Sequence, residues 1–133
     1  MPSPSTAPPS LPASVRIGEG RGGLTVVRVA GRAGSAEIYL HGAQVTDFTP
    51  AGGRPALFLS DASRFEAAAA IRGGVPICFP WFGANALDPA APSHGFARLS
   101  EWEFVDAHES ADDVVLTFRL TDTPATRASA WPH

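Results

Sequence analysis

Lysine is absent from this 133-residue sequence, and all ten of its Lys/Arg positions are arginine, so catalysis through a lysine Schiff base is excluded. The single cysteine, Cys78, excludes an internal disulfide, a cysteine-ligated zinc site and a CxxC redox pair. Thirteen acidic residues leave a net charge of -3, which gives no electrostatic basis for binding nucleic acid or an acidic membrane. The apolar runs are all far too short to span a bilayer.

The first 14 residues also lack an apolar core and any basic residue, so they do not resemble a secretory signal. Five prolines and four serines in this stretch predict an extended, solvated tail over residues 1–14. Residues 15–133 then form one domain, which is long enough to bury a hydrophobic core. We expect a cytoplasmic protein, which also suits an unpaired Cys78.

From residue 15 onward the hydrophobic residues follow a period of two, which is typical of strands. Residues 35–40 and 43–48 alternate on either side of His41-Gly42, and this pattern predicts a hairpin with a two-residue turn. Further strands are predicted at 24–30, 56–59, 102–107 and 114–120. Short strands with turns between them indicate an all-β antiparallel sandwich or barrel.

One segment departs from this rhythm. Ser63 is followed three residues later by Glu66, which matches a helix capping box, and four alanines come next. Gly73 and Gly74 would end a helix. The sequence therefore predicts one short helix or helical turn in this part of the chain.

Two residues with potential chemistry have a structural interpretation. Cys78 has apolar neighbours throughout residues 75–82, which favours a core thiol. His41 occupies a predicted turn with no second metal ligand at a suitable spacing, which favours a solvated turn histidine.

Two short segments indicate ligand binding. Arg72 directly precedes Gly73-Gly74, where the glycines would let the backbone approach a ligand. His94 and Arg98 are four residues apart in a loop before a predicted strand. Two guanidinium groups and an imidazole suit an anionic, hydroxyl-rich ligand such as a sugar phosphate. The alternative is that both arginines pair with carboxylates such as Asp88 or Glu101.

The segments 71–83 (IRGGVPICFPWFG) and 94–98 (HGFAR), with Trp102, resemble the glucose-6-phosphate 1-epimerases, the hexose-6-phosphate mutarotases related to aldose 1-epimerase. Residues 38–45 (IYLHGAQV) and 131–133 (WPH) are similar to the same family. The resemblance runs from about residue 24 to residue 133 and covers the N-terminal portion of such an enzyme.

This resemblance implies a galactose-mutarotase-like antiparallel β-sandwich, incomplete at the C-terminus, and interconversion of the α and β anomers of an aldohexose 6-phosphate. It implies that Arg72, Arg98 and His94 bind substrate. Ser93 stands where some relatives have a substrate-contacting glutamine. The family's catalytic histidine and glutamate lie further along the chain, so no catalytic residue and no metal ligand is assigned here.

The resemblance further implies an isomerase that needs no cofactor, that acts on a hexose 6-phosphate without nucleic-acid or membrane partners, and that is a monomer when full length. The truncated chain alone is expected to be inactive. Two alternatives remain open from the residues: a non-catalytic sugar-phosphate-binding β-domain, and an inactive structural fragment without a ligand.

Overall fold

The computed structural model describes residues 10–129 and 131–133, and most of its regular structure is β-strand. The strands are β1 (Val15–Glu19), β2 (Thr25–Gly31), β3 (Gly34–Tyr39), β4 (Gln44–Pro50), β5 (Glu103–Glu109) and β6 (Val114–Arg119). The helical segments are short: 3-10 turns at Arg21–Gly23 and Ala97–Leu99, and α1 at Pro124–Arg127.

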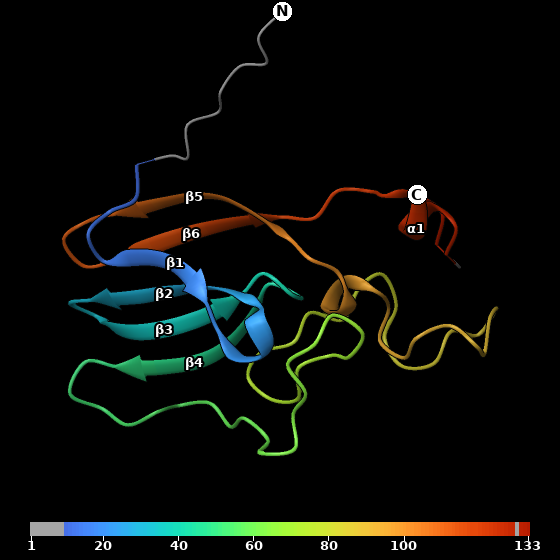
Figure 1. Ribbon diagram of the computed structural model, residues 1–133, viewed down its shortest axis with the longest axis horizontal. Helices are drawn as coiled ribbons and strands as arrows, with labels where there is room; N and C mark the ends of the chain where they lie inside the picture. Colours follow the sequence, from blue (N-terminus) through green and yellow to red (C-terminus); the bar gives the residue numbers. More distant parts are fainter. Residues whose placement is uncertain (1–9, 130) are drawn as a thin grey trace, which may run out of the picture.

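β1 to β4 form an antiparallel sheet in chain order, as Figure 1 shows. The predicted strands at 24–30, 35–40 and 43–48 are confirmed as β2, β3 and β4. The turn is centred on His41 and Gly42 as predicted, since the Ala43 amide donates to the Leu40 carbonyl at 3.2 Å, but Tyr39 pairs with Gln44, so four residues rather than two separate the paired strands. Gly42 has a φ of 79° but His41 has no positive φ, so the centre of this turn lacks the two positive φ angles that a type I′ turn requires.

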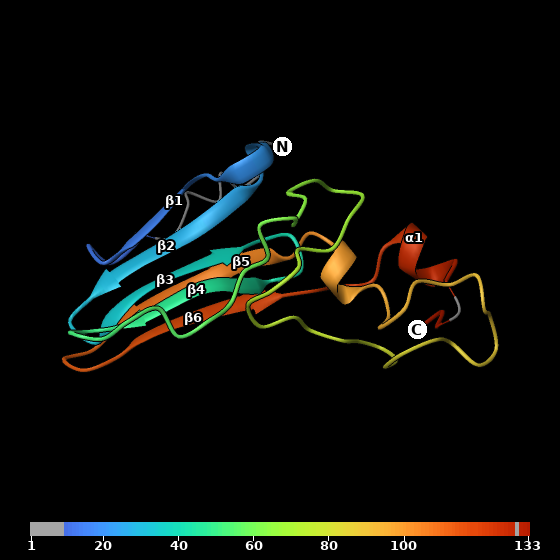
Figure 2. The ribbon, with the colours of Figure 1, turned by 90° about the horizontal axis from the view of Figure 1, so that it is seen from below.

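A hairpin of β5 and β6 forms a second layer against one face of this sheet (Figures 1 and 2). The sheet buries Val27, Val29 and Ile38, and the hairpin packs Phe104 and Phe118 against them. The ring centroids of Phe104 and Phe118 lie 5.3 Å from each other. The predicted all-β antiparallel architecture is therefore confirmed, with its main core between the two layers.

β5 departs from strict alternation. The sequence pattern puts Phe104 and Ala107 on opposite faces, but both pack against the core. A bulge between Phe104 and Asp106 shifts the register, so that Asp106 lies opposite Thr117. The extra residue of a bulge reverses the faces of all side chains that follow it, which accounts for the difference.

The other face of the four-stranded sheet buries Val26, Tyr39 and Ile71. Most of its cover comes from the long irregular segment between β4 and β5, seen in green to yellow in Figure 2. The predicted strand at 56–59 is wrong, since only a single bridge joins Leu59 to Gly73. The Ala56 amide also donates to the Phe48 carbonyl at 2.8 Å, but no strand forms over residues 56–59.

No helix forms after Ser63, and the predicted helix or helical turn is present only as a single turn in which the Ala69 amide donates to the Glu66 carbonyl at 3.3 Å. The Ser63 hydroxyl accepts a hydrogen bond from the amide of Arg72 at 2.9 Å, so it is engaged by a distant segment of the chain. Phe65 packs on Tyr39 with a centroid distance of 5.1 Å. These tertiary contacts outweigh the helix propensity of the alanines that follow, which is only a few tenths of a kcal/mol per residue, roughly.

Most of the predicted N-terminal tail, residues 1–9, lies outside the described residues. Within residues 10–14, Leu11 packs against the main core, and the Ser14 hydroxyl donates to the Glu109 carboxylate at 3.1 Å. Cys78 is only partly buried, so the expected core thiol retains some exposure. Among the described residues, none of the helices has the length and apolar character needed to cross a membrane.

Candidate functional site

Three arginines, Arg64, Arg72 and Arg98, line one open cavity of about 700 Å³. Its remaining lining comes from Ala62, Leu99 and the alanines of residues 68–70, and no carboxylate is among the lining residues that the structure describes. The sequence predicted two of the three arginines. The cavity is therefore strongly electropositive and suits an anion.

Arg72 is held in place by its neighbours on the chain. The Gln44 side-chain amide, fully buried in β4, donates to the carbonyls of Ile71 at 2.9 Å and Gly73 at 2.5 Å. The Arg72 amide donates to the Ser63 hydroxyl at 2.9 Å, and its carbonyl accepts from the Ser60 amide at 2.9 Å. The backbone on both sides of Arg72 is thus fixed, while its side chain is exposed.

Gly73 and Gly74 serve the protein's own packing. Gly73 has φ +122°, and a Cβ there would lie 2.5 Å from the Phe58 carbonyl oxygen. At Gly74, with φ +66°, a Cβ would lie 2.0 Å from the Val45 carbonyl oxygen. The expectation that these glycines admit a ligand to the backbone is therefore wrong, since neighbouring backbone occupies that space.

Arg98 lies in the 3-10 turn Ala97–Leu99, next to the β3–β4 turn. The Gly42 amide donates to the Ser100 carbonyl at 2.8 Å, and a Cβ on Gly42 would lie 3.0 Å from the Arg98 carbonyl oxygen. The Arg98 Nη2 donates to the Ser93 carbonyl at 3.0 Å. Its Nε is buried without a partner among the described residues, so the guanidinium keeps an unused donor.

Neither cavity arginine predicted from the sequence forms an ion pair within the described part of the chain. The four ion pairs there join Arg28 to Glu37, Arg64 to Glu66, Arg119 to Glu103 and Arg127 to Asp122. The alternative in which Arg72 and Arg98 pair with Asp88 or Glu101 is therefore wrong. Their charges are free to meet a ligand.

Ser93 contacts Arg98, but neither Ser93 nor His94 is among the residues that line the cavity. The His94 Nδ1 accepts a hydrogen bond from the Gly83 amide at 2.9 Å, and its ring centroid lies 4.7 Å from that of Phe82. Because Nδ1 is an acceptor, the neutral ring carries its proton on Nε2. Ser93 offers its carbonyl to Arg98 and is otherwise exposed.

Sequence reasoning missed the contributions of His41 and Arg64. His41 is 5% exposed, and its Nε2 lies 2.7 Å from the Ala69 carbonyl oxygen, so the interpretation as a solvated turn histidine is wrong. This contact holds the alanine segment that lines the cavity. The length of the intervening chain, 28 residues, explains why no local pattern indicated it.

The chemistry available in the cavity is binding. Among the described residues, none that lines it is a histidine, aspartate or glutamate, and a guanidinium does not release its proton near neutral pH. No group of three or more His, Cys, Asp or Glu residues in the described chain could hold a metal ion. The site can orient an anionic ligand, and proton transfer requires groups other than those lining it.

Comparison with known proteins bears on this cavity. The model of the family described as "Aldose 1-epimerase" matches residues 25–133. The chain is 46% identical over 98 residues to a protein of Escherichia coli named "Putative glucose-6-phosphate 1-epimerase", covering 74% of this chain and 33% of that protein. A protein of the same name from Salmonella typhimurium is 44% identical over 98 residues, which again cover 74% of this chain and 33% of that protein.

Solved structures agree with the fold. The crystal structure titled as a "putative mutarotase" from Salmonella typhimurium aligns with a TM-score of 0.77 and 36% identity, covering 90% of this chain and 43% of that one. A Synechocystis protein aligns with a TM-score of 0.63 and 26% identity, covering 76% and 38%. The chain spans about a third of the length of the curated relatives it matches.

Proposed function

Because the chain belongs to the aldose 1-epimerase family, we propose that its arginine cavity binds an aldohexose 6-phosphate as part of a glucose-6-phosphate 1-epimerase-like site. The observation that carries the proposal is that Arg72 and Arg98 line one cavity whose described lining residues include no carboxylate. A phosphate dianion is the group that such a pair of planar donors matches best.

The proposed reaction exchanges the α and β anomers. A general base takes the proton of the anomeric hydroxyl while a general acid protonates the ring oxygen, and the C1–O5 bond breaks to give the open-chain aldehyde. Rotation about the C1–C2 bond and ring closure then give the other anomer, with both protons returned. The reaction is redox-neutral and needs no cofactor.

In this scheme the cavity contributes position and charge. Arg72 and Arg98 bind the substrate, whereas Ser93, whose carbonyl accepts from Arg98, and the adjacent His94 do not line the cavity. Fixing the phosphate orients the sugar ring, and orientation of reactants is a large part of enzymatic rate enhancement. No acid or base for the anomeric centre is assigned among the described residues, so a non-catalytic sugar-phosphate-binding domain is the second candidate.

The proposal is tested by titrating the chain with glucose 6-phosphate and following backbone amide shifts. Arg98→Gln should weaken binding at least about tenfold more than Arg119→Gln, because charge-assisted hydrogen bonds contribute roughly 1.5–3 kcal/mol each. Arg119 is a matched control, since it pairs with Glu103 at 3.0 Å on the outward face of β6. Equal affinities for the two variants would overturn the assignment of the cavity.

A further inference from the structure

We propose that Arg64 is a third anion-binding residue of the cavity and that it determines the preference for a phosphorylated over an unphosphorylated sugar. The inference rests on the proposed function, since it concerns the same site. Arg64 lines the cavity together with Arg72 and Arg98, although it belongs to neither segment that the sequence singled out. Its role follows from its placement, the weakness of its ion pair and the charge around it.

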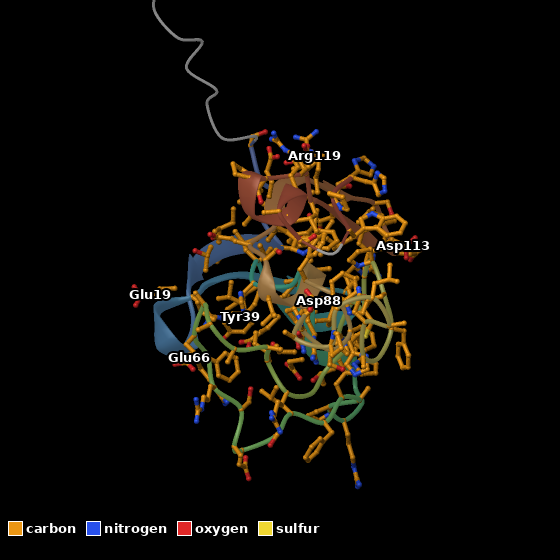
Figure 3. The ribbon with its side chains drawn as sticks, turned by 90° about the vertical axis from the view of Figure 1, so that its right-hand side faces the viewer. Glu19, Tyr39, Glu66, Asp88, Asp113 and Arg119 are labelled. Atoms are coloured by element: carbon orange, nitrogen blue, oxygen red, sulfur yellow. The ribbon has the colours of Figure 1, made fainter. Side chains whose placement is uncertain are left out.

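The backbone on both sides of Arg64 is anchored. Ser63 accepts the amide hydrogen of Arg72 at 2.9 Å, which ties it directly to the segment carrying a second cavity arginine. Phe65 packs on Tyr39, whose side chain is 2% exposed, and the Arg21 guanidinium lies 5.2 Å from the Phe65 ring centroid. Figure 3 shows Tyr39 within the molecule and Glu66 at its edge. Arg64 therefore leaves the backbone at a fixed point of the cavity wall.

The positive charge of Arg64 is available to a ligand. Its only ion-pair partner in the described chain is Glu66, at 3.6 Å, and the two side chains are 77% and 50% exposed. Exposed pairs of this kind contribute little, because water screens them and two long side chains must be ordered. Turning the guanidinium from Glu66 to an anion in the cavity consequently costs little.

The charge balance of the cavity explains why Arg64 would act on selectivity. Three guanidinium groups without a lining carboxylate repel one another, and a phosphate dianion relieves that repulsion. A neutral sugar offers hydroxyl groups but no compensating charge. Arg64 should therefore strengthen binding of glucose 6-phosphate and of inorganic phosphate and leave binding of glucose unchanged.

The test compares the 133-residue chain with Arg64→Gln, Arg64→Lys and the matched control Arg54→Gln. Arg54 is also an exposed arginine, but it follows the turn after β4 and does not line the cavity. The affinities for glucose 6-phosphate and inorganic phosphate, measured by titration, should fall about threefold to tenfold in Arg64→Gln. This is the range for a partly solvated charge-assisted contact. Arg64→Lys should keep most of the affinity because it keeps the charge, and Arg54→Gln should change it less than about twofold.

Chemical modification gives a second readout that does not depend on a variant. Phenylglyoxal labels accessible arginines, and peptide mass spectrometry should show phosphate protecting Arg64 as well as Arg98 while Arg54 remains labelled. The inference would be overturned if Arg64→Gln bound phosphate with wild-type affinity and phosphate did not protect Arg64 from labelling. If Arg98→Gln lost binding in the same experiments, the proposed function would still stand. Absence of phosphate and sugar-phosphate binding by the wild-type chain would overturn both.

Discussion

The buried side-chain amide of Gln44 donates a hydrogen bond to the carbonyl of Ile71 at 2.9 Å, which joins β4 to the segment that carries Arg72. Gln44 is fully buried, so the carbonyl it satisfies has no access to water if the amide is removed. The contact links the stability of the sheet to the geometry of the cavity.

Gln44→Met should therefore lower the free energy of unfolding by about 2–4 kcal/mol, since it leaves two carbonyls without donors. The matched control is Thr46→Val on the same buried face, where the hydroxyl makes a single long bond of 3.3 Å to the Glu37 carbonyl. We expect that change to cost under about 1 kcal/mol. Urea denaturation measures both, and equal costs would show that the Gln44 bonds do not hold residue 71.

Alternating hydrophobic residues predicted β3, β4 and β6, and a short run rich in β-branched residues predicted β2, although Val26 and Tyr39 are buried on the opposite face of the sheet from Val27 and Ile38. β1 went unpredicted, because Val15 is its only buried residue and the remaining four positions are exposed. In β6, Val114, Leu116 and Phe118 pack on the core as the alternation predicted. Period-two patterns thus locate strands that have one buried face, and they miss an edge strand with little burial.

The irregular segment between β4 and β5 was less predictable, and so was the complete cavity. Ser63 and Glu66 match a capping box, yet the Ser63 hydroxyl serves Arg72 in the fold. Arg64 lines the same cavity as Arg72 and Arg98, and the residues on either side of it are anchored by that long-range bond and by the Phe65–Tyr39 contact. Contacts of this kind leave no periodic signal in the sequence. Arg72 and Arg98 were found because their surrounding motifs are distinctive.

Gly74→Ala should be much more damaging than Gly83→Ala. Both glycines have similar positive φ angles, +66° and +73°, so the backbone strain of an alanine is nearly the same at the two sites. A Cβ at Gly74 would collide with the Val45 carbonyl, whereas nothing lies within 4 Å of one at Gly83. We expect a cost of about 1 kcal/mol at Gly83 and several times that at Gly74.

Thermal unfolding of the two glycine variants under identical conditions measures the difference. Sugar-phosphate binding should also fall in Gly74→Ala, because Arg72 lies two residues away on the displaced segment. Similar melting temperatures for both variants would mean that the contact between Gly74 and β4 is absent in solution.

His41→Leu should destabilise the protein more than His108→Leu. The His41 ring is buried and lies 2.7 Å from the Ala69 carbonyl oxygen, so leucine leaves that carbonyl unpaired. The expected cost is about 1–3 kcal/mol, against less than about 0.5 kcal/mol for the exposed His108. Amide hydrogen exchange near residues 67–70 should rise in His41→Leu, and unchanged protection there would contradict a role for His41 in holding the cavity wall.

The chain as it stands should bind glucose 6-phosphate without exchanging its anomers above the uncatalysed rate. Positioned proton transfer supplies about 10²–10⁴-fold per group, and no acid or base lines the arginine cavity in the described structure. His94 is the group close in the chain to Arg98 that could transfer a proton, although it does not line the cavity. Its Nδ1 accepts from the Gly83 amide and its ring packs on Phe82, which leaves only Nε2 available for proton transfer. Polarimetry on freshly dissolved α-anomer measures the rate directly, with His94→Ala as the control. Enzyme-like exchange that disappears in His94→Ala would show that this histidine is a catalytic group and that the cavity does more than bind.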